Sequence, residues 1–508
     1  MRRIAFVLAV VACVSSVVAF GQTQPVASSP LPVVSTQVTE QAGSVIGATQ
    51  EVGVDVCAKI HSALEALQAS GGTVDARDFT TNQSCSSDPF AGITKPFTLI
   101  LPYTSIKTSH PWRLSGAQEL VKSSVSGNPA QIVASESYPK AAITTLTATG
   151  KVVTVTTSRR HGFSPGEAVS ITGTTNPSLE GVFWVKTATP TAFTYLLSVP
   201  DTVGTGGAAS PPLVTIGTDD SNYGQPGTRL EGLYLDGSKE GIAVLFANIN
   251  GQELSGIRDS VLVNFSNYGI YIAGPNANSG TGNTSYEHLV LAFGPGPAPD
   301  AVGICVSSGG GARYLFNDVT LVANGTGRGR YAFQTLGSTT FDIRGMHVEN
   351  YRTMVEASAG SYGIIQTLLG GAGVEYGVDI NTAGAIAATF VSGTLKAALV
   401  NHYTGTTLND IVFDYLYSGS SPKQEVYFTA PNERGLVSTG LTLTGAVPTT
   451  SGSEVGLGNT TAFGNGNVGV PVTTTSKSSG GGPEEPQTIV RYLEVNIGGT
   501  NYWLPLLR

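Results

Sequence analysis

Apolar residues between about residues 228 and 350 recur in a fixed arrangement that is not helical. An apolar residue is followed three positions later by another, and usually by a third two positions further on. The arrangement starts anew at Leu230, Leu254, Tyr286, Phe316 and Ile343, at separations of 24, 32, 30 and 27 residues. A second short strand pattern follows at 241–244, 269–272, 303–306 and 331–333. A strand, a turn, a strand and a loop in each period predict one coil of a solenoid. A β-sandwich is the alternative, but it would not require both strand patterns to recur in the same order.

One helix is predicted near the start of the chain. Asp55 suits an N-cap, and Gly71 and Gly72 suit the end. The apolar residues between them fall on one helical face, at Ile60, Ala63, Leu64 and Leu67. A short helix at the head of an all-β chain predicts a cap over the first coil, which would otherwise expose its core and its strand edge.

Two further segments depart from the coils. Residues 141–210 contain a clean alternation at 151–156 and a turn at 161–167, and they predict a small inserted β-domain. The coil pattern fades after residue 420. A polar linker at 476–486 then precedes two strands separated by Gly498 and Gly499, which predict a terminal hairpin.

The predicted organisation has six parts. These are a signal peptide (1–21), a flexible leader (22–50), the cap with the first coils (51–140), the insert (141–210), further coils (211–420) and a C-terminal β-region (421–508).

Composition and charge limit the classes of partner that this protein could bind. Only 12% of the 508 residues are charged and the net charge is −8, so no basic patch is available for nucleic acid. Arg2 and Arg3 precede an apolar run at 4–20, and small residues before Gln22 suit cleavage of a secretory signal. A retained anchor helix and lipidation at Cys13 are the alternatives. No other segment is long and apolar enough to span a bilayer. The sequence thus predicts a secreted or cell-surface protein.

The cysteines fit export. Cys57 and Cys85 flank one short N-terminal unit and are the expected disulfide in an oxidising compartment. Cys305 lies within a strand pattern and is expected to be a packed thiol.

Residues 55–125 resemble the start of secreted bacterial proteins of the pectate-lyase-like superfamily. The residues that carry the resemblance are 57–60, 71–77, Cys85 and 98–101. With the coils to about residue 418, the resemblance implies an all-β, right-handed parallel β-helix with an N-terminal capping helix. The insert resembles small β-modules of phage tail and surface proteins, and the terminal hairpin resembles the endings of phage tail-fibre-like proteins.

The resemblance does not select one activity. The superfamily includes pectate lyases, polygalacturonases, tailspike endoglycosidases and non-catalytic adhesins. The polygalacturonase motifs Asn-Thr-Asp, Gly-His-Gly and Arg-x-Lys are absent, and Asp219 and Asp220 lie in a turn before the coils. The clustered calcium-binding Asp residues of pectate lyases are not evident either.

Residues between the apolar positions are expected to point outward and to stack in columns. One expected column is Glu231, Ser255, Glu287, Asn317 and Arg344, and its neighbour is Tyr234, Arg258, Val290, Thr320 and His347. A sugar polymer would lie along such columns. The expected binding residues are Glu231, Tyr234, Asp236, Arg258, Asp259, Glu287 and Asn317.

The densest polar group is Asp342, Arg344, His347 and Glu349, and these are the candidate catalytic residues. In a lyase, Arg344 or His347 would act as base while a carboxylate-bound cation such as Ca²⁺ neutralised a uronate. A solvated strand face with surface ion pairs is the structural alternative. His347 and Glu349 lack a third ligand, so no metal site is predicted.

Two functional hypotheses follow. The first is an exported β-helix that interacts with polysaccharide, as a polysaccharide lyase or a glycoside hydrolase. The second is a non-catalytic surface adhesin or a structural, tail-spike-like protein, for which a homotrimer is the expected assembly.

Overall fold

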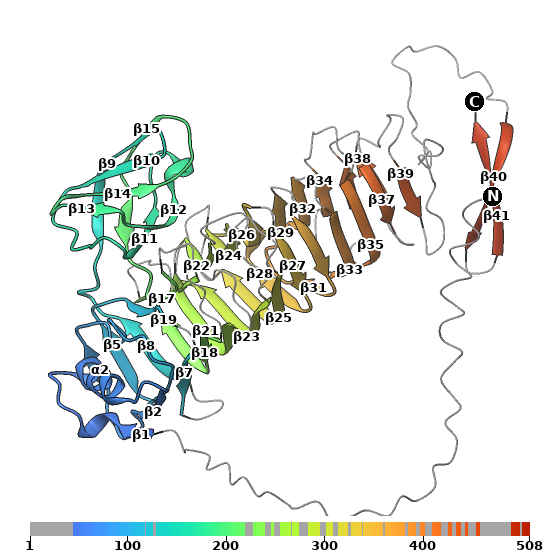
Figure 1. Ribbon diagram of the computed structural model, residues 1–508. Coiled ribbons are helices and arrows are strands. Elements are labelled where there is room, and N and C mark those ends of the chain that lie inside the picture. The colour runs from blue at the N-terminus through green and yellow to red at the C-terminus, as the bar shows by residue number, and fades with distance from the viewer. Residues whose placement is uncertain are drawn as a thin grey trace, which may run out of the picture. The chain divides into compact units, whose positions relative to one another are not determined.

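The described part of the chain is dominated by parallel strands stacked coil upon coil (Figure 1). The computed structural model describes residues 44–116, 118–124, 129–218, 227–238, 245–247, 255–265, 267–273, 283–294, 301–307, 313–323, 327–337, 339–358 and 361–381, and strands beyond residue 384. The predicted signal peptide, Cys13, Asp219, Asp220, Leu254, the strand pattern at 241–244 and the linker at 476–486 lie outside these residues.

The main sheet has 20 strands in two rows, and each coil contributes either a pair of short strands or a single strand. Its first row is β1 (Ser44–Gly47), β2 (Gly72–Asp75), β4 (Phe97–Leu101), β7 (Glu119–Ser123), β18 (Arg229–Glu231), β21 (Gly256–Phe265), β23 (Asn283–Phe293), β25 (Arg313–Ala323), β27 (Thr340–Ile343), β30 (Tyr362–Ile365), β33 (Ala385–Ser392), β35 (Asn409–Tyr417), β37 (Glu433–Val437) and β39 (Glu454–Leu457). Its second row is β3 (Gln83–Cys85), β5 (Ser105–Thr108), β8 (Ala130–Ala134), β19 (Leu233–Asp236), the second halves of β21, β23 and β25, β28 (Met346–Glu349), β31 (Leu368–Gly370) and the second halves of β33 and β35.

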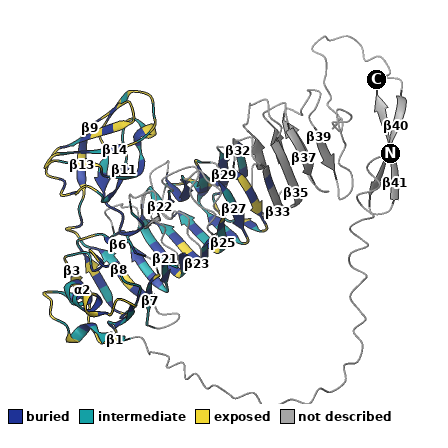
Figure 2. Cartoon of the chain, viewed as in Figure 1, coloured by how far each residue is buried: buried dark blue, intermediate teal, exposed yellow. Residues whose placement is uncertain are grey.

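A second sheet of 11 parallel strands closes each coil. It contains β6 (Trp112–Leu114), β17 (Val214–Ile216), β20 (Leu245–Ala247), β22 (Tyr268–Ile272), β24 (Val302–Val306), β26 (Gly329–Thr335), β29 (Tyr351–Ser358), β32 (Tyr376–Asn381), β34 (Ala397–Asn401), β36 (Glu425–Phe428) and β38 (Thr442–Gly445). The inner faces of both sheets share one apolar core, and buried positions recur from strand to strand (Figure 2). The fold is the expected right-handed parallel β-helix.

The parallel ladder extends beyond both ends expected from the sequence. Residues 44–50, which we expected in the flexible leader, form β1 and a 3₁₀ helix, η1 (Ala48–Gln50). β1 pairs in parallel with β2, so it is the first strand of the stack. At the other end, β36 to β39 continue the stack past residue 420.

The register of one coil differs from our expectation. We aligned Leu254 with Leu230, but Leu230 pairs with Ile257. The error arose because the next inward position in this coil is Ser260, whose hydroxyl accepts a hydrogen bond from the Leu233 N–H at 3.1 Å. A polar inward residue interrupts the apolar pattern that set the alignment. Arg258 therefore belongs to the column of Glu231, where we had placed Ser255, and Ser255 is buried.

The predicted capping helix is α2 (Val56–Ala66). The Asp55 carboxylate accepts the Ala58 N–H at 2.9 Å, as expected of an N-cap. Cys57 on this helix forms the expected disulfide with Cys85 on β3, whereas Cys305 is a buried free thiol. The disulfide therefore ties the cap to the second row of the main sheet.

The insert is a small antiparallel β-domain with its own core. Its elements are β9 (Ala141–Thr149), β10 (Val152–Thr157), β11 (Ala168–Thr172), η2 (Pro177–Leu179), β12 (Gly181–Trp184), β13 (Thr187–Ala188), β14 (Ala192–Leu196), β15 (Thr202–Thr205) and β16 (Ala208–Ser210). His161, which we interpreted as a turn residue, is buried beside Phe163 and Phe193, and its Nδ1 accepts the Phe163 N–H at 2.9 Å.

The predicted terminal hairpin is present. β40 (Ile489–Ile497) and β41 (Thr500–Leu507) pair antiparallel up to Ile497 and Thr500. The two glycines of the turn lie outside the described residues.

Loss of the disulfide is expected to destabilise the cap. It closes a loop across 28 residues, so the chain-entropy estimate of its contribution is about 3–4 kcal/mol. We expect the double variant Cys57→Ser, Cys85→Ser to melt at a lower temperature by circular dichroism. Reduction of the wild type should reproduce the shift, and an unchanged melting curve on reduction would contradict it.

A buried acid is expected to make stability depend on pH. Glu119 is fully buried, and burial raises its pKa to about 8, although the Gly116 N–H offsets part of the rise. The folded protein therefore holds this proton at pH values where the unfolded chain, with a pKa near 4.5, has lost it. This contribution to stability falls as pH rises from about 4.5 to 8, by up to about 1.4 kcal/mol per pH unit.

We expect Glu119→Gln to remove this part of the pH dependence. The melting temperature of the variant relative to the wild type should rise steadily between pH 5 and pH 8. Parallel curves across that range would show that Glu119 stays ionised in the fold.

Candidate functional site

A column of charged side chains follows the outer face of the first row of the main sheet. In register from coil to coil, the column is Lys122, Glu231, Arg258, Glu287 and Asn317, with Arg344 following beside Asn317. Positive and negative charges alternate over its first four members. Arg258 donates to the Glu287 carboxylate at 3.1 Å, and both side chains are partly exposed. Of the expected binding residues, the structure therefore brings Glu231, Arg258, Glu287 and Asn317 into one column.

Polar residues also occupy the corner between the two rows. Gly232 has a φ of 67°, and the next three coils place Asp259 (φ 50°), His288 (φ 52°) and Asp318 (φ 54°) at the equivalent position. The left-handed region is uncommon for residues other than glycine, and Asp, Asn and His are the side chains that adopt it most often. His288 Nδ1 lies 3.0 Å from Asp259 Oδ1, and both side chains are more than half exposed.

We call six residues on these three coils the polar corner. They are Arg258, Asp259, Glu287, His288, Asn317 and Asp318. The sequence analysis included four of them and missed His288 and Asp318. The missed signal was a pair of adjacent polar residues at the same place in three successive coils.

The predicted catalytic residues separate into two pairs. The Asp342 side chain is 3% exposed. Its Oδ2 accepts hydrogen bonds from Arg313 Nη2 at 2.8 Å and from Arg344 Nε at 3.3 Å. His347 and Glu349 lie beyond Gly345, with His347 Nε2 3.5 Å from Glu349 Oε1. Among the described residues, no hydrogen bond or ion pair joins the two pairs. Asp342 is thus a buried carboxylate whose charge is balanced by two arginines.

The remaining expected binding residues have different surroundings. Asp236 accepts from the Ser238 N–H at 2.7 Å and from Asn264 Nδ2 at 2.8 Å, so its carboxylate fixes the end of β19. Tyr234 is half-buried in the next outward column, and burial raises the pKa of its hydroxyl. Its ring lies in the column next to the column of Glu231 and Arg258.

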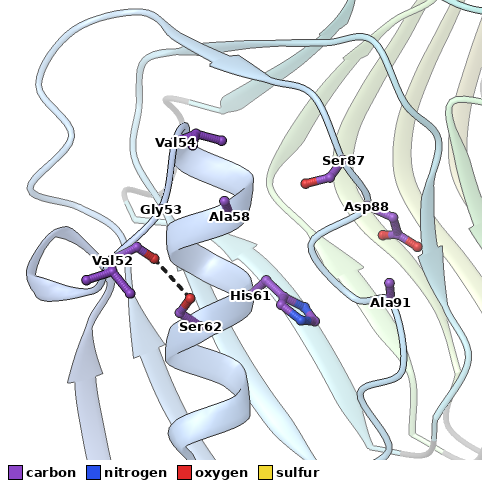
Figure 3. A pocket seen from close by; sticks show the side chains of 9 residues that line it. All are labelled: Val52, Gly53, Val54, Ala58, His61, Ser62, Ser87, Asp88 and Ala91. Atoms are coloured by element: carbon purple, nitrogen blue, oxygen red, sulfur yellow. Dashed lines mark hydrogen bonds between the residues drawn. The ribbon is translucent and has the colours of Figure 1, made fainter.

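A hollow of about 430 Å³ lies beside α2 (Figure 3). Small and apolar residues line most of it, and His61 and Asp88 are its ionisable side chains. Burial raises the pKa of Asp88 to about 6, while its carboxylate accepts the N–H groups of Phe90 and Arg113. Asp88 therefore organises the loop after β3, and none of the site residues expected from sequence borders this hollow.

In the described ranges, no group of three or more His, Cys, Asp or Glu side chains is arranged to hold a metal ion. In the same part of the chain, no helix has both the length and the apolar character needed to cross a bilayer.

The Arg258–Glu287 ion pair is expected to add little to folding stability. Both partners are partly exposed, and pairs of this kind contribute less than about 1 kcal/mol. A double-mutant cycle with Arg258→Ala and Glu287→Ala, measured by urea unfolding, should give a coupling within that limit. A coupling of several kcal/mol would mean that the column serves the fold.

Comparison with known proteins identifies no family. No family model and no curated protein matches the chain. Among solved structures, the tailspike protein gp49 from Pseudomonas phage LKA1 aligns with 80% of this chain and 74% of its own, at 9% identity and a TM-score of 0.21. A similarity this distant carries no argument about function, which has to come from the sites themselves.

Proposed function

We propose that this protein is an exported β-helix that binds a polysaccharide along the outer face of the main sheet, centred on the polar corner. The observation that carries the proposal is the corner itself. Three successive coils place Asp259, His288 and Asp318 in a backbone conformation that Gly232 adopts without steric cost. Since the fold accepts glycine there, the corner needs no side chain for its backbone, and the exposed side chains can serve contacts outside the chain besides the Asp259–His288 contact.

The chemistry of the corner suits a hydroxyl-rich polymer. Arg258 supplies hydrogen-bond donors, the carboxylates of Asp259, Glu287 and Asp318 supply acceptors, and His288 supplies one of each when neutral. Successive coils are about 4.8 Å apart, so equivalent groups repeat along the stack as they do along a polymer.

Two features support export. The N-terminal basic and apolar pattern is that of a secretory signal, and the Cys57–Cys85 disulfide is of the kind that persists in oxidising compartments. Binding is common to an enzyme and to an adhesin, so the first test of the proposal measures binding and not turnover.

We expect His288→Gly to weaken polysaccharide binding without weakening the fold. Glycine removes the imidazole and relieves the left-handed backbone, so the melting temperature should stay the same or rise. Loss of about one hydrogen bond should reduce affinity roughly fivefold. Affinity electrophoresis with polygalacturonate, alginate, xylan and bacterial O-chain polysaccharides would measure the affinity, and calorimetry would measure the melting temperature.

The matched control is Asn350→Gly. Asn350 has a φ of 60° at a different corner, after β28, and lies outside the polar corner. It should leave binding unchanged. Equal binding by His288→Gly and the wild type, or no binding by the wild type to any of these polymers, would refute the proposed site.

A further inference from the structure

The outer face of the second sheet carries a pair of acids that the sequence analysis did not single out. Along one outward column, Tyr271, Cys305, Gln334, Glu356 and Asp379 follow one another in register. Glu356 and Asp379 are direct partners on β29 and β32. Coils are about 4.8 Å apart, so the two carboxyl groups fall on that scale.

The insert packs on the start of this column. Ala168 and Val182 of the insert pack with Tyr271, Val302 and Cys305 in one apolar cluster. Gln334, Glu356 and Asp379 continue the column on the next three coils. The acid pair thus lies on the same outer face, with the coil of Gln334 between it and Cys305, which the insert contacts.

Glu356 has the surroundings of an acid held in its protonated form. It is only 6% exposed, and Oε2 has no hydrogen-bond partner among the described residues. Burial raises its pKa to about 7, the charge of Asp379 adds to the rise, and Gln334, Arg330 and Ser358 oppose it. A buried carboxyl oxygen without a partner, beside a second carboxylate, is costly for the fold alone.

Aromatic rings and cations flank the pair. Tyr331 and Tyr376 lie two coils apart in the neighbouring outward column, with Thr353 between them. The Arg330 guanidinium lies 4.8 Å from the centre of the Tyr331 ring, and that of Arg352 lies 5.8 Å from the centre of Tyr376. The charges of Arg330 and Asp379 act on both Tyr331 and Glu356, so these four residues lie close together. The Tyr331 ring also packs against the apolar cluster that includes Ala168 and Val182 of the insert, whereas Tyr376 is partly exposed. The flat ring of Tyr376 beside the carboxyl pair suits the face of a sugar ring.

We propose that Glu356 and Asp379 form a glycoside-hydrolysing pair that cleaves a polysaccharide with retention of anomeric configuration. The inference deepens the proposed function, on which it rests, by assigning a reaction to a second wall of the β-helix. We assign retention because paired residues on adjacent coils are spaced on the scale of about 5–5.5 Å that retaining enzymes use, whereas inverting enzymes leave room for a water.

The two residues have different roles in the reaction. Glu356 donates its proton to the glycosidic oxygen while the Asp379 carboxylate attacks the anomeric carbon, so that the glycosidic bond breaks and a glycosyl ester forms. The leaving sugar departs as an alcohol. Glu356 then takes a proton from water, the resulting hydroxide attacks the anomeric carbon, and the ester bond to Asp379 breaks. Water is the sole co-reactant, and both carboxyl groups return to their first state.

The test is cleavage by the full mature chain of the same four classes of polysaccharide: polygalacturonate, alginate, xylan and O-chain. We expect new reducing ends on at least one polymer, without the ultraviolet absorbance of an unsaturated uronate. Glu356→Gln and Asp379→Asn should each lose at least about 100-fold of this activity. Glu136→Gln, which changes an exposed acid in a turn before the insert, is the control and should keep full activity.

Two further readouts separate chemistry from structure. Activity of the wild type should fall above about pH 7, since Glu356 must be protonated to act as the acid. Sodium azide should restore sugar release to Asp379→Ala by taking the place of the missing nucleophile, and should leave Glu356→Gln inactive toward the unmodified polymer. Rescue would not be seen if Asp379 only supported the fold.

The outcomes distinguish this inference from the proposed function. Binding that depends on His288 without release of reducing ends would leave the polar corner intact and overturn the acid pair. Unsaturated products, or full activity in Glu356→Gln, would also overturn it. Cleavage that depends on Glu356 and is unaffected by His288→Gly would support the acid pair and count against the corner as the binding surface.

Discussion

The hydrogen-bonded register between successive coils is the constraint on which the whole structure depends. Each coil lays its strands parallel on those of the preceding one, at about 4.8 Å. A residue therefore meets its own equivalent above and below. Leu230, Ile257, Tyr286, Phe316 and Ile343 form an inward stack, and the adjacent positions form the outward column of Glu231, Arg258, Glu287 and Asn317. The apolar core and the outward column are therefore consequences of the same pairing.

Departures from that regularity mark the places where side chains are not explained by packing. At the corner of the main sheet, three polar residues hold a left-handed backbone that Gly232 holds in the neighbouring coil. On the second sheet, Glu356 keeps a buried carboxyl oxygen without a partner in the described part of the chain. Both cases cost folding free energy, and sites that cost the fold are where ligands and reactions are to be sought.

The two proposed sites lie on different walls of the coil, and they differ in electrostatic character. The polar corner is at least partly exposed and carries charges of both signs, which favours multiple weak contacts along a polymer. In the acid pair Glu356 is buried and Asp379 is partly exposed, and the insert packs on an earlier part of the same outer column. In a low local dielectric, the pKa values of two neighbouring carboxyl groups move apart, so that one can hold a proton while its partner is charged.

The sequence by itself determined that this chain coils. The apolar spacing, the N-cap at Asp55, the cysteine pair and the antiparallel signals of the insert and hairpin are local patterns, and each was confirmed. Local patterns suffice because strand alternation and turn chemistry act over a few residues.

Only the tertiary structure decided which side chains meet. Ser260 at an inward position displaced our alignment of one coil and put Arg258 in the wrong column. On the second sheet, Gly269 and Gly303 approach neighbouring backbone too closely for a side chain, and the strict in-and-out alternation breaks there. Glu356 and Asp379 are 23 positions apart and become neighbours through the register of β29 and β32 alone. The pairing between coils depends on loop lengths and inward polar residues, which a periodic apolar pattern does not encode.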